Sequence, residues 1–408
     1  MADETLFDNF RPPMTPALVV RRAALLHNLQ VMQGFCDAAG VSLRAHGKMH
    51  KCSQLGRLQI ELGAKGLCCQ TVGEAEVYAK VGVRDLLVTA PVAPWGARRL
   101  AELASTGAEI AVVVDDEGQV ERLSEAARAH GSRLRVVIDL DLGLHRAGAH
   151  PEDAGPLAKA IQRSGSLTYA GVQAYLGHLQ HLADVDRRRT ATQDALARLK
   201  DIIADLSVAG LAPEIVTGGG TGTYVTDLAS GVFNELQAGS YAFMDVEYDD
   251  CGAPDGGPWP FRPALLVAAS VVSARHKSHV TIDAGLKAFS VDGPPARPVR
   301  GAAPGSRWRS MGDEHGAIYH PLAGEALKRA GAQGGDPVAV LDADPAFPWP
   351  EDAPRVGDVV WLQPGHCDPT VNLYDALYVA DEDGSAEVWP IDARRRNGDV
   401  SFSGSNQP

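Results

Sequence analysis

The sequence predicts a (β/α)8 barrel followed by a mainly β domain. Two observations lead to this prediction: short buried-type segments alternate with segments of helical period from about residue 41 to 245, and the pattern then changes to short strands separated by turns. The length of 408 residues exceeds the roughly 250 that one barrel occupies. We therefore expect a barrel over residues 15–250 and a β-rich domain over residues 260–408, against which residues 1–14 pack.

The barrel prediction depends on the number of strands. Eight segments read as strands: 41–46, 66–70, 85–90, 109–115, 133–140, 167–175, 214–218 and 234–239. A helix is expected before them at 21–38, where Leu25, Leu29, Met32 and Phe35 recur every three to four residues. Eight strands that alternate with helices match a closed (β/α)8 barrel.

The second half of the chain reads as strands joined by turns. The expected strands are 264–274, 279–285, 337–343, 358–365, 376–381 and 386–390. The stretches 293–305 and 342–354 are rich in proline and glycine, so we expect loops or lids there.

Composition excludes several classes of protein. The 38 basic and 51 acidic residues give a net charge of −13, which disfavours binding to nucleic acid or to an anionic membrane surface. No apolar run approaches the roughly 18 residues of a membrane-spanning helix. The six cysteines form no C-x-x-C pair, and the first residues show no secretory signal. We expect a cytoplasmic protein with reduced cysteines.

Two lysines follow the first barrel strand, Lys48 and Lys51. The active site of a (β/α)8 barrel is built from the loops at the carboxyl ends of its strands. An enclosed lysine there can become a neutral amine and form a Schiff base with a carbonyl cofactor. Most lysines are solvated surface charges, but this position favours the functional interpretation.

A glycine run, Thr217-Gly-Gly-Gly-Thr-Gly-Thr, follows the seventh strand, and Gly239-Ser-Tyr follows the eighth. Barrel phosphate sites lie in these two loops, where backbone N–H groups can converge on an anion. A flexible turn is the alternative interpretation. The phosphate-binding candidates are Thr217, Gly219, Gly220, Thr221, Gly239, Ser240 and Tyr241.

Strands five and six end in further polar residues. Arg146 is placed to keep the ring nitrogen of a pyridine cofactor unprotonated, and Tyr175 to pack on or beside such a ring, although both can be ordinary residues of the barrel rim. His178 and His181 follow Tyr175, and a histidine has a pKa suited to a general base. The residues alone leave the choice between the two histidines open.

The β-rich half contains Pro-Gly-His366-Cys-Asp368. If this segment is extended, His366 and Asp368 point to the same side and can hold one divalent cation. Imidazole with carboxylate suits Mn²⁺, Zn²⁺, Co²⁺ or Mg²⁺. A single H-x-D is a common pattern, and most instances bind no metal.

Several stretches are similar to one known family. They are RAHGKMHKC, GLCCQTVGEAEV, GVQAY, VTGGGTGTY, NELQAGSYAFMD, TIDAGLKA, DEHG and PGHCDPTVNLYD. In these stretches the chain resembles the fold-type III pyridoxal-phosphate enzymes of the D-threonine aldolase, 3-hydroxy-D-aspartate aldolase and D-serine dehydratase group. The resemblance runs through nearly the whole chain in the family's order.

The resemblance implies an alanine-racemase-like barrel with a β domain, arranged as a head-to-tail homodimer with shared active sites. Lys48 matches the Schiff-base lysine, and His181 matches the histidine that deprotonates the β-hydroxyl of the substrate. Arg146 and Tyr175 match neighbours of the cofactor ring, and the glycine loop with Ser240 and Tyr241 matches the phosphate cup. His366 and Asp368 match the metal pair, for which Mn²⁺ is our first choice. At His145, Leu176 and His178 the chain departs from its relatives, so the substrate pocket can differ there.

The expected activity is cleavage of a D-3-hydroxy amino acid, such as 3-hydroxy-D-aspartate or D-threonine, to glycine and an aldehyde. A D-serine or D-3-hydroxyaspartate dehydratase is the nearest alternative, although Asp368 stands where such dehydratases have cysteine. A non-catalytic pyridoxal-phosphate-binding protein is a second alternative, and an amino acid racemase a third.

Overall fold

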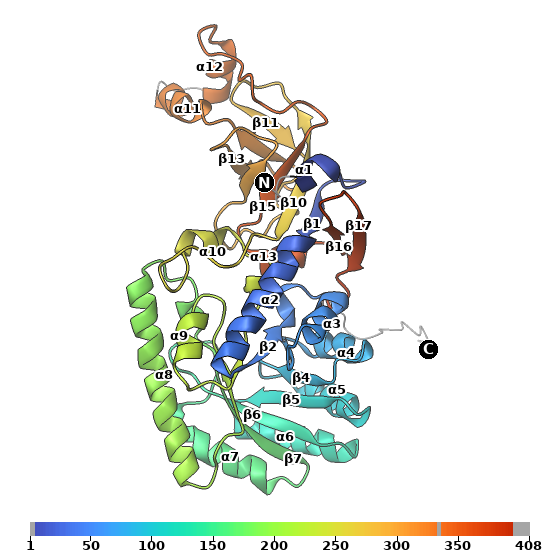
Figure 1. Ribbon diagram of the computed structural model, residues 1–408, viewed down its shortest axis with the longest axis vertical. Coiled ribbons are helices and arrows are strands. Elements are labelled where there is room, and N and C mark those ends of the chain that lie inside the picture. The colour runs from blue at the N-terminus through green and yellow to red at the C-terminus, as the bar shows by residue number, and fades with distance from the viewer. Residues whose placement is uncertain (1–4, 333–335, 395–408) are drawn as a thin grey trace, which may run out of the picture. The chain divides into compact units, whose positions relative to one another are not determined.

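The computed structural model describes residues 5–332 and 336–394. These residues form two compact units. The barrel unit contains residues 33–182, 186–239 and 391–394, and the β-rich unit contains residues 5–32, 183–185, 240–332 and 336–390 (Figure 1). Residues 1–4 and 395–408, which the sequence prediction included in the β-rich part, lie outside the described residues.

Eight parallel strands close the barrel in sequence order, which confirms the predicted fold class. They are β2 (Ser42–His46), β3 (Gly66–Cys69), β4 (Asp85–Val88), β5 (Glu109–Val114), β6 (Leu134–Asp139), β7 (Leu167–Ala174), β8 (Ile215–Gly218) and β9 (Glu235–Leu236). β2 pairs with β3 on one side and with β9 on the other, and this second pairing closes the barrel. All eight strands coincide with predicted segments.

One helix precedes the barrel strands, as predicted for residues 21–38, and seven helices alternate with them. They are α2 (Arg22–Ala39), α3 (Ser53–Glu61), α4 (Val72–Lys80), α5 (Pro94–Ser105), α6 (Glu117–Ala129), α7 (Ala154–Arg163), α8 (Val185–Val208) and α9 (Tyr224–Ala229). Side-chain caps fix two of the starts, because Thr71 accepts a hydrogen bond from the Glu74 N–H and Asp116 accepts one from the Gln119 N–H.

The barrel interior combines an apolar cluster with a buried ion-pair network. Cys68, Leu87, Ala111, Val113, Val137, Ala170 and Ile215 form the cluster. The guanidinium of the buried Arg44 donates to Glu235 at 2.7 Å and to Asp85 at 2.6 Å. The neighbouring residue on β3 must be glycine, because a Cβ atom on Gly66 would lie 2.4 Å from the backbone carbonyl oxygen of Asp85 and 2.6 Å from Nη1 of Arg44. The network therefore fixes side-chain identities on three strands.

The β-rich unit is built on a nine-stranded sheet with the order β13-β14-β11-β10-β1-β16-β17, in which β15 pairs with β10 and β12. The strands are β1 (Ala17–Arg21), β10 (Leu265–Ser273), β11 (His279–Ile282), β12 (Arg297–Arg300), β13 (Arg307–Ser310), β14 (Gly316–Tyr319), β15 (Val359–Gln363), β16 (Ala376–Ala380) and β17 (Ala386–Pro390). β1 pairs antiparallel with β10 and parallel with β16, so a strand from the start of the chain completes this sheet.

Two predictions for this half were wrong. The segment 337–343, predicted as a strand, is helix α12 (Pro337–Ala343), because Asp336 accepts from the N–H groups of Val338 and Ala339 and Pro337 occupies the first turn. The predicted loop 293–305 contains β12, which pairs with β15 despite its proline. Helix α11 (Ala323–Ala332) and the strands β1, β13 and β14 were not predicted.

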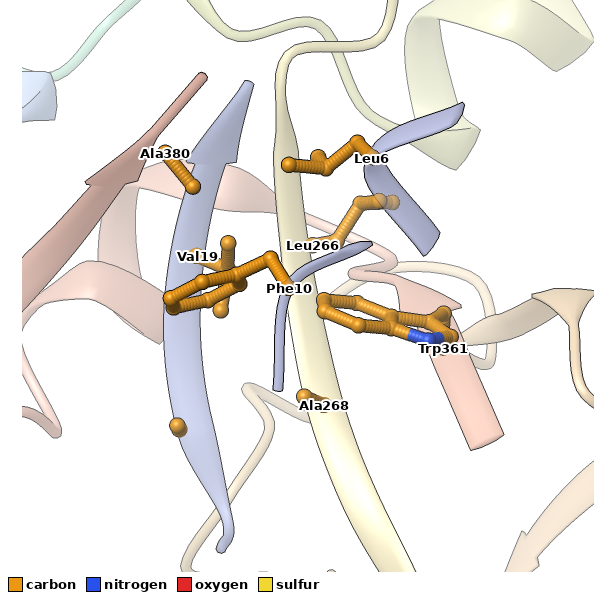
Figure 2. Close-up of a cluster of buried hydrophobic side chains, with 8 residues drawn as sticks. Leu6, Phe10, Val19, Leu266, Ala268, Trp361 and Ala380 are labelled. Carbon is orange, nitrogen blue, oxygen red and sulfur yellow. The ribbon is translucent and has the colours of Figure 1, made fainter. Parts of the chain in front are cut away.

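The first helix, α1 (Thr5–Asn9), packs on the sheet of the β-rich unit. Figure 2 shows Leu6 and Phe10 beside Val19 of β1, Leu266 of β10 and Trp361 of β15. The ring of Phe7 lies edge-on to Trp361, with a centroid distance of 5.3 Å. The start of the chain thus covers apolar side chains on three neighbouring strands.

Two further properties of the described residues bear on the class of protein. None of the helices in this part of the chain combines the length and the apolar character that crossing a membrane requires. The six cysteines, all within the described residues, form no disulfide, and their side chains are buried.

Candidate active site

Lys48 lies directly after β2, in the short 3-10 helix η1 (Gly47–Met49). The His46 ring accepts a hydrogen bond from the Lys48 backbone N–H at 3.4 Å, and the Tyr78 hydroxyl donates to the Gly47 carbonyl at 2.8 Å. A Cβ atom on Gly47 would lie 2.6 Å from the Tyr78 ring. His46 and Tyr78 therefore hold the start of the turn that carries Lys48.

The second lysine of this turn is already paired. Nζ of Lys51 lies 2.5 Å from Oε1 of Glu74, whose side chain is fully buried. Oε2 of the same carboxylate accepts from the Gln70 N–H at 2.6 Å. Lys51 thus neutralises a buried carboxylate, which leaves Lys48 as the better candidate for the reactive amine.

The last described residues brace the other end of the turn. The Asp392 carboxylate accepts from the backbone N–H of Ser53 at 2.9 Å and from its hydroxyl at 2.6 Å. The Ala393 N–H donates to the Lys51 carbonyl at 2.9 Å. The beginning of α3 is therefore capped by residues that lie far away in the sequence.

Three of the predicted residues converge on one aromatic ring. Nζ of Lys48 and Cζ of Arg146 each lie 5.6 Å from the ring centroid of Tyr175. Lys48 follows β2, Arg146 lies in the loop after β6, and Tyr175 directly follows β7. The barrel brings together an amine, a guanidinium and a phenol ring from three loops, as the rule for barrel loops predicts.

The His46 ring is buried beside this group. Its Nε2 lies 3.2 Å from Oγ1 of Thr89, which follows β4. Burial, together with the nearby charges of Lys48, His50 and Lys51, lowers the pKa of His46 well below its ordinary value. The ring is therefore neutral and adds no positive charge next to the Lys48 amine.

A chain of buried hydrogen bonds links the ends of five strands, β4, β6, β7, β8 and β9. Gln173 donates to the Thr89 carbonyl at 3.1 Å and to Asp139 at 2.8 Å. Gln237 donates to Oε1 of Gln173 at 2.9 Å and to Oγ1 of Thr217 at 3.0 Å. The sequence analysis missed Thr89, Asp139 and Gln237 as parts of this chain. The sequence feature that could have revealed them is a polar residue at the end of an apolar strand.

Asp139 is the acidic end of this chain. Burial raises the pKa of Asp139 to about 6, although the hydrogen bond from Gln173 opposes the shift. Near neutral pH its proton therefore exchanges easily, whereas the amide and hydroxyl groups of the chain do not titrate.

The glycine loop after β8 is fixed from within the barrel unit. The Gly222 N–H donates to Oε1 of Gln180 at 2.9 Å, and a Cβ atom at this position would lie 1.9 Å from the Gln180 carbonyl oxygen. Gly219 adopts a φ of 70°, which favours glycine. Packing against Gln180 thus requires glycine at position 222, independently of any ligand.

Asp227 of α9 holds the same loop. Its Oδ2 accepts from the Gly220 N–H at 3.2 Å and from the Thr223 hydroxyl at 2.6 Å. Burial raises the pKa of Asp227 to about 7. Because the N–H groups of Gly220 and Gly222 donate to Asp227 and Gln180, the predicted phosphate contacts of this loop must come from its other groups.

The loop after β6 is organised by Asp141. Its Oδ1 accepts from the N–H groups of Gly143 at 2.9 Å and His145 at 3.0 Å, and its Oδ2 lies 2.8 Å from Nδ1 of His145. Burial opposes ionisation of Asp141, but these hydrogen bonds prevail and lower its pKa to about 2. His145, at a φ of 56°, is exposed and held by Asp141, and it directly precedes Arg146.

The two candidate base histidines lie around the 3-10 helix η3 (Gly177–Leu179). His178 is exposed, and partial burial lowers its pKa. His181 is half-buried, and its Nε2 atom is shielded from solvent. A shielded ring nitrogen suits a base that acts on a bound substrate, but the choice of His181 stays a prediction.

The second group of predicted residues lies in the β-rich unit. His366 is extended, with φ −135° and ψ 118°, and it precedes helix α13 (Cys367–Val371). Asp368 therefore lies in the first turn of a helix and not on the extended segment that the sequence analysis considered. The helix begins here because the Asp245 carboxylate accepts from the Cys367 N–H at 2.9 Å.

Several acceptors surround this pair. Nδ1 of His366 lies 3.0 Å from Oδ2 of Asp292 and 4.0 Å from Oε2 of Glu247. The Ser240 hydroxyl lies 3.4 Å from Oδ1 of Asp368. Asp245 is occupied structurally, because it also accepts from the Tyr248 N–H at 3.0 Å. Asp292 and Glu247 were not predicted, since no local pattern connects them to His366.

The predicted phosphate residues do not all lie in one unit. Thr217, Gly219, Gly220, Thr221 and Gly239 belong to the barrel unit. Ser240 and Tyr241, in the 3-10 helix η4 (Ser240–Ala242), belong to the β-rich unit, where the buried Tyr241 ring packs near Phe261 at 5.8 Å. The division between the units falls directly after Gly239.

The donor set at His366 fits a divalent cation held by few protein groups. Within residues 5–332 and 336–394, no three His, Cys, Asp or Glu side chains are arranged to hold a metal ion together. One imidazole and one carboxylate, with further carboxylates nearby, suit an exchangeable cation that keeps open positions. The amine, guanidinium and aromatic ring of the barrel group likewise fit an aldehyde cofactor with a pyridine ring.

Two family models match the chain. Residues 20–247 match the model described as alanine racemase, N-terminal domain. Residues 264–380 match the model described as putative serine dehydratase domain. The two matches follow each other along the chain and together cover most of its length.

Individual relatives are similar over nearly the whole chain. A 3-hydroxy-D-aspartate aldolase from Paracoccus denitrificans is 38% identical over 389 residues, which cover 93% of this chain and 92% of that protein. The crystal structure of a D-threonine aldolase from Filomicrobium marinum matches with a TM-score of 0.83 and 34% identity, over 93% of this chain and 96% of that one. A D-threo-3-hydroxyaspartate dehydratase from a Delftia species is 27% identical, over 92% of this chain and 96% of that protein.

Proposed function

Because the chain belongs to the family of 3-hydroxy-D-aspartate and D-threonine aldolases, carbon–carbon lyases of the pyridoxal-phosphate-dependent, alanine-racemase-like fold, we propose that it cleaves D-3-hydroxy amino acids to glycine and an aldehyde. In this proposal the barrel of residues 15–250 binds the cofactor, and the β-rich residues 260–408 supply a divalent metal site. Mn²⁺ is the first choice of metal, with Mg²⁺, Co²⁺ and Zn²⁺ as alternatives.

One geometric observation carries the proposal. The Lys48 amine and the Arg146 guanidinium each lie 5.6 Å from the same tyrosine ring, that of Tyr175, at the carboxyl ends of the barrel strands. Lys51, the other lysine of the turn, is engaged by Glu74. The site therefore offers one amine for covalent attachment, beside a guanidinium and an aromatic ring.

Each residue of the barrel group has a distinct role in this proposal. Lys48 would hold the cofactor covalently through its side-chain amine. The Arg146 guanidinium only donates hydrogen bonds, so a pyridine nitrogen facing it would stay unprotonated. Tyr175 lies beside the ring, and the loop from Thr217 to Thr221 with Gly239, Ser240 and Tyr241 holds the phosphate. The cofactor, when bound, supplies the electron sink for Cα–Cβ cleavage.

The substrate hydroxyl is handled by the remaining predicted residues. His366 and Asp368 would hold the divalent cation, which supplies Lewis-acid stabilisation of a bound hydroxyl oxygen. His181 takes the hydroxyl proton as the Cα–Cβ bond breaks. The neutral ring of His366 can bind the cation through one nitrogen only if its other nitrogen carries the proton.

Dehydration is the nearest competing reaction, because it needs the same cofactor and a similar arrangement of acid, base and metal. Two observations favour cleavage. The compared aldolase is 38% identical to this chain and the compared dehydratase 27%. The second member of the metal pair is Asp368, with the neighbouring Cys367 buried and directed to Asp368 and Asp245.

Product identification tests the proposal. Purified protein with pyridoxal phosphate and Mn²⁺ is incubated with 3-hydroxy-D-aspartate, D-threonine and D-serine, and the products are identified by mass spectrometry. We expect glycine with glyoxylate from 3-hydroxy-D-aspartate and glycine with acetaldehyde from D-threonine. A keto acid with ammonia would move the assignment to dehydratase. No turnover, with cofactor bound, would leave a binding protein.

We also infer a homodimer in which both subunits complete each active site, located in the cytoplasm. The family resemblance supports the dimer. Light scattering coupled to size-exclusion chromatography tests it, and a monomer that is fully active at all concentrations would contradict it.

A further inference from the structure

Asp292 lies against the predicted metal ligand His366, although 74 residues separate them in the sequence. Its Oδ2 atom is 3.0 Å from Nδ1 of the imidazole. A carboxylate can only accept at this distance, so Nδ1 must carry the ring proton. In the neutral ring the lone pair is then on Nε2, the nitrogen directed away from Asp292.

A closed circuit of hydrogen bonds holds this geometry. The Ser290 hydroxyl donates to Oδ1 of Asp292, and the Ser290 N–H donates to Oγ1 of Thr370 at 3.1 Å. The Thr370 hydroxyl in turn donates to the His366 carbonyl at 2.7 Å. The circuit therefore joins the side chain of His366 to its own backbone through three other residues.

Close backbone packing seats the loop of Asp292 on the turn of His366. A Cβ atom on Gly293 would lie 3.2 Å from Cβ of His366. A Cβ atom on Gly365 would lie 1.7 Å from the Pro294 carbonyl oxygen. The approach at Gly365 needs glycine, and a Cβ atom at position 293 would crowd His366, so the two loops pack closely beside the imidazole and its carboxylate partner.

The other three carboxylates near His366 do not occupy the place that Asp292 has beside Nδ1. Oε2 of Glu247 is 4.0 Å from Nδ1, beyond hydrogen-bonding distance. Asp245 accepts the N–H groups of Cys367 and Tyr248. Asp368 is the second member of the predicted metal pair. Among these four carboxylates, only Asp292 lies at hydrogen-bonding distance from Nδ1 of His366.

We propose that Asp292 is a positioning residue that fixes the tautomer and orientation of His366 so that Nε2 faces a divalent cation. The inference rests on the proposed function in naming the cation, but the tautomer is a property of the protein alone. Partners of this kind, which orient a ligating histidine, typically change metal affinity by about 10- to 100-fold when they are removed.

The first test measures Mn²⁺ binding by electron paramagnetic resonance of the free ion. We expect Asp292→Ala to weaken binding by about 10- to 100-fold, and Asp292→Asn, which keeps an oxygen acceptor, to fall between that variant and the natural protein. Glu247→Ala is the matched control, since it removes an equal charge near the same ring atom, and we expect about a two- to threefold effect. His366→Ala, which removes a predicted metal ligand, gives the background level of Mn²⁺ binding.

The second test needs no metal. Protein with ¹⁵N-labelled histidine is examined by NMR at a pH where the rings are neutral, and a His366→Gln variant assigns the signal. We expect the Nδ1–H tautomer in the natural protein and its loss in Asp292→Ala. The side chain of Asp292 is 54% exposed, so its removal should leave the fold intact.

The outcomes separate the two proposals. Equal weakening by Asp292→Ala, Asp292→Asn and Glu247→Ala would reduce Asp292 to a simple negative charge and overturn its positioning role. An unchanged tautomer in Asp292→Ala would do the same. Absence of Mn²⁺ binding in the natural protein, with the tautomer still dependent on Asp292, would count against the proposed metal and retain the positioning role.

Discussion

The mouth of the barrel and the turn around His366 differ in how they hold their functional groups. In the barrel, the side chains that brace the Lys48 group are buried, and Gln173 and Gln237 link strands through neutral hydrogen bonds. At His366 the ring is 26% exposed and faces carboxylates. A covalently held organic cofactor needs a fixed frame, whereas an exchangeable cation needs negative acceptors and open positions. The two regions suit these different tasks.

Removal of the Lys48 amine should have the largest effect on activity, because it takes the covalent attachment point out of the barrel site. Lys48→Ala should lower kcat by at least about a thousandfold, since no other group supplies covalent attachment. Borohydride reduction followed by mass spectrometry should find the cofactor on Lys48 in the natural protein and no cofactor adduct in the variant.

The control for this experiment is Lys51→Arg. It keeps the positive charge beside Glu74 but offers no amine that can attach an aldehyde. We expect the cofactor adduct to remain in this variant. An adduct retained in Lys48→Ala and lost in Lys51→Arg would transfer the role to the second lysine.

Metal removal tests the β-rich half. Treatment with EDTA, or the change His366→Ala, should lower activity by about 100-fold or more while the absorbance of the bound cofactor persists. Added Mn²⁺ should restore the EDTA-treated protein but not the variant at the same concentration. Full activity in EDTA, with the loss of metal verified by mass spectrometry, would show that the reaction does not need a metal bound at His366.

The glycine loop tests whether the barrel frame is as fixed as its hydrogen bonds indicate. In Gly222→Ala, the new Cβ atom would lie 1.9 Å from the Gln180 carbonyl oxygen, so the loop must shift. We expect cofactor affinity, measured by fluorescence titration, to fall by about 10-fold. Gly34→Ala in α2 is the matched control, since its Cβ atom meets no atom within 4 Å and should stabilise the fold by about 0.5–1 kcal/mol.

The last prediction concerns the stability of the fold and Asp227, the titratable group that holds that loop. Burial raises the pKa of Asp227 to about 7, so the folded state retains a proton that the unfolded state loses near pH 4. The free energy of unfolding should therefore fall as the pH rises from about 4 to about 7, by up to about 1.4 kcal/mol per pH unit. Urea unfolding at several pH values measures this slope. In Asp227→Asn the contribution should vanish, and identical slopes would refute the assignment.

The sequence contained enough information to predict the barrel. Strands in a closed parallel barrel are short and apolar, and their ends carry the reactive residues, so Lys48, Arg146 and Tyr175 were predictable as neighbours. The hydrogen-bonded chain from Asp139 to Thr217 was not predictable, because its partners are distant in sequence and each alone is an ordinary polar residue.

The β-rich unit was less predictable for two physical reasons. The run Pro-Val-Ala-Val-Leu-Asp-Ala looks like a strand by its valines, yet the Asp336 cap and Pro337 start a helix, and this capping signal outweighs β propensity. The position of Asp292 beside His366 arises from the packing of two loops through Gly293 and Gly365, which no local pattern indicates.

The brace that Asp392 and Ala393 form on the turn after Lys48 bears on how the protein matures in a cell. The ribosome makes the lysine turn early and its last support 339 residues later, as the numbers of Ser53 and Asp392 show. At about 5–20 residues per second, the barrel waits for tens of seconds with α3 uncapped. A polypeptide released before residue 392 therefore lacks this support for the lysine turn.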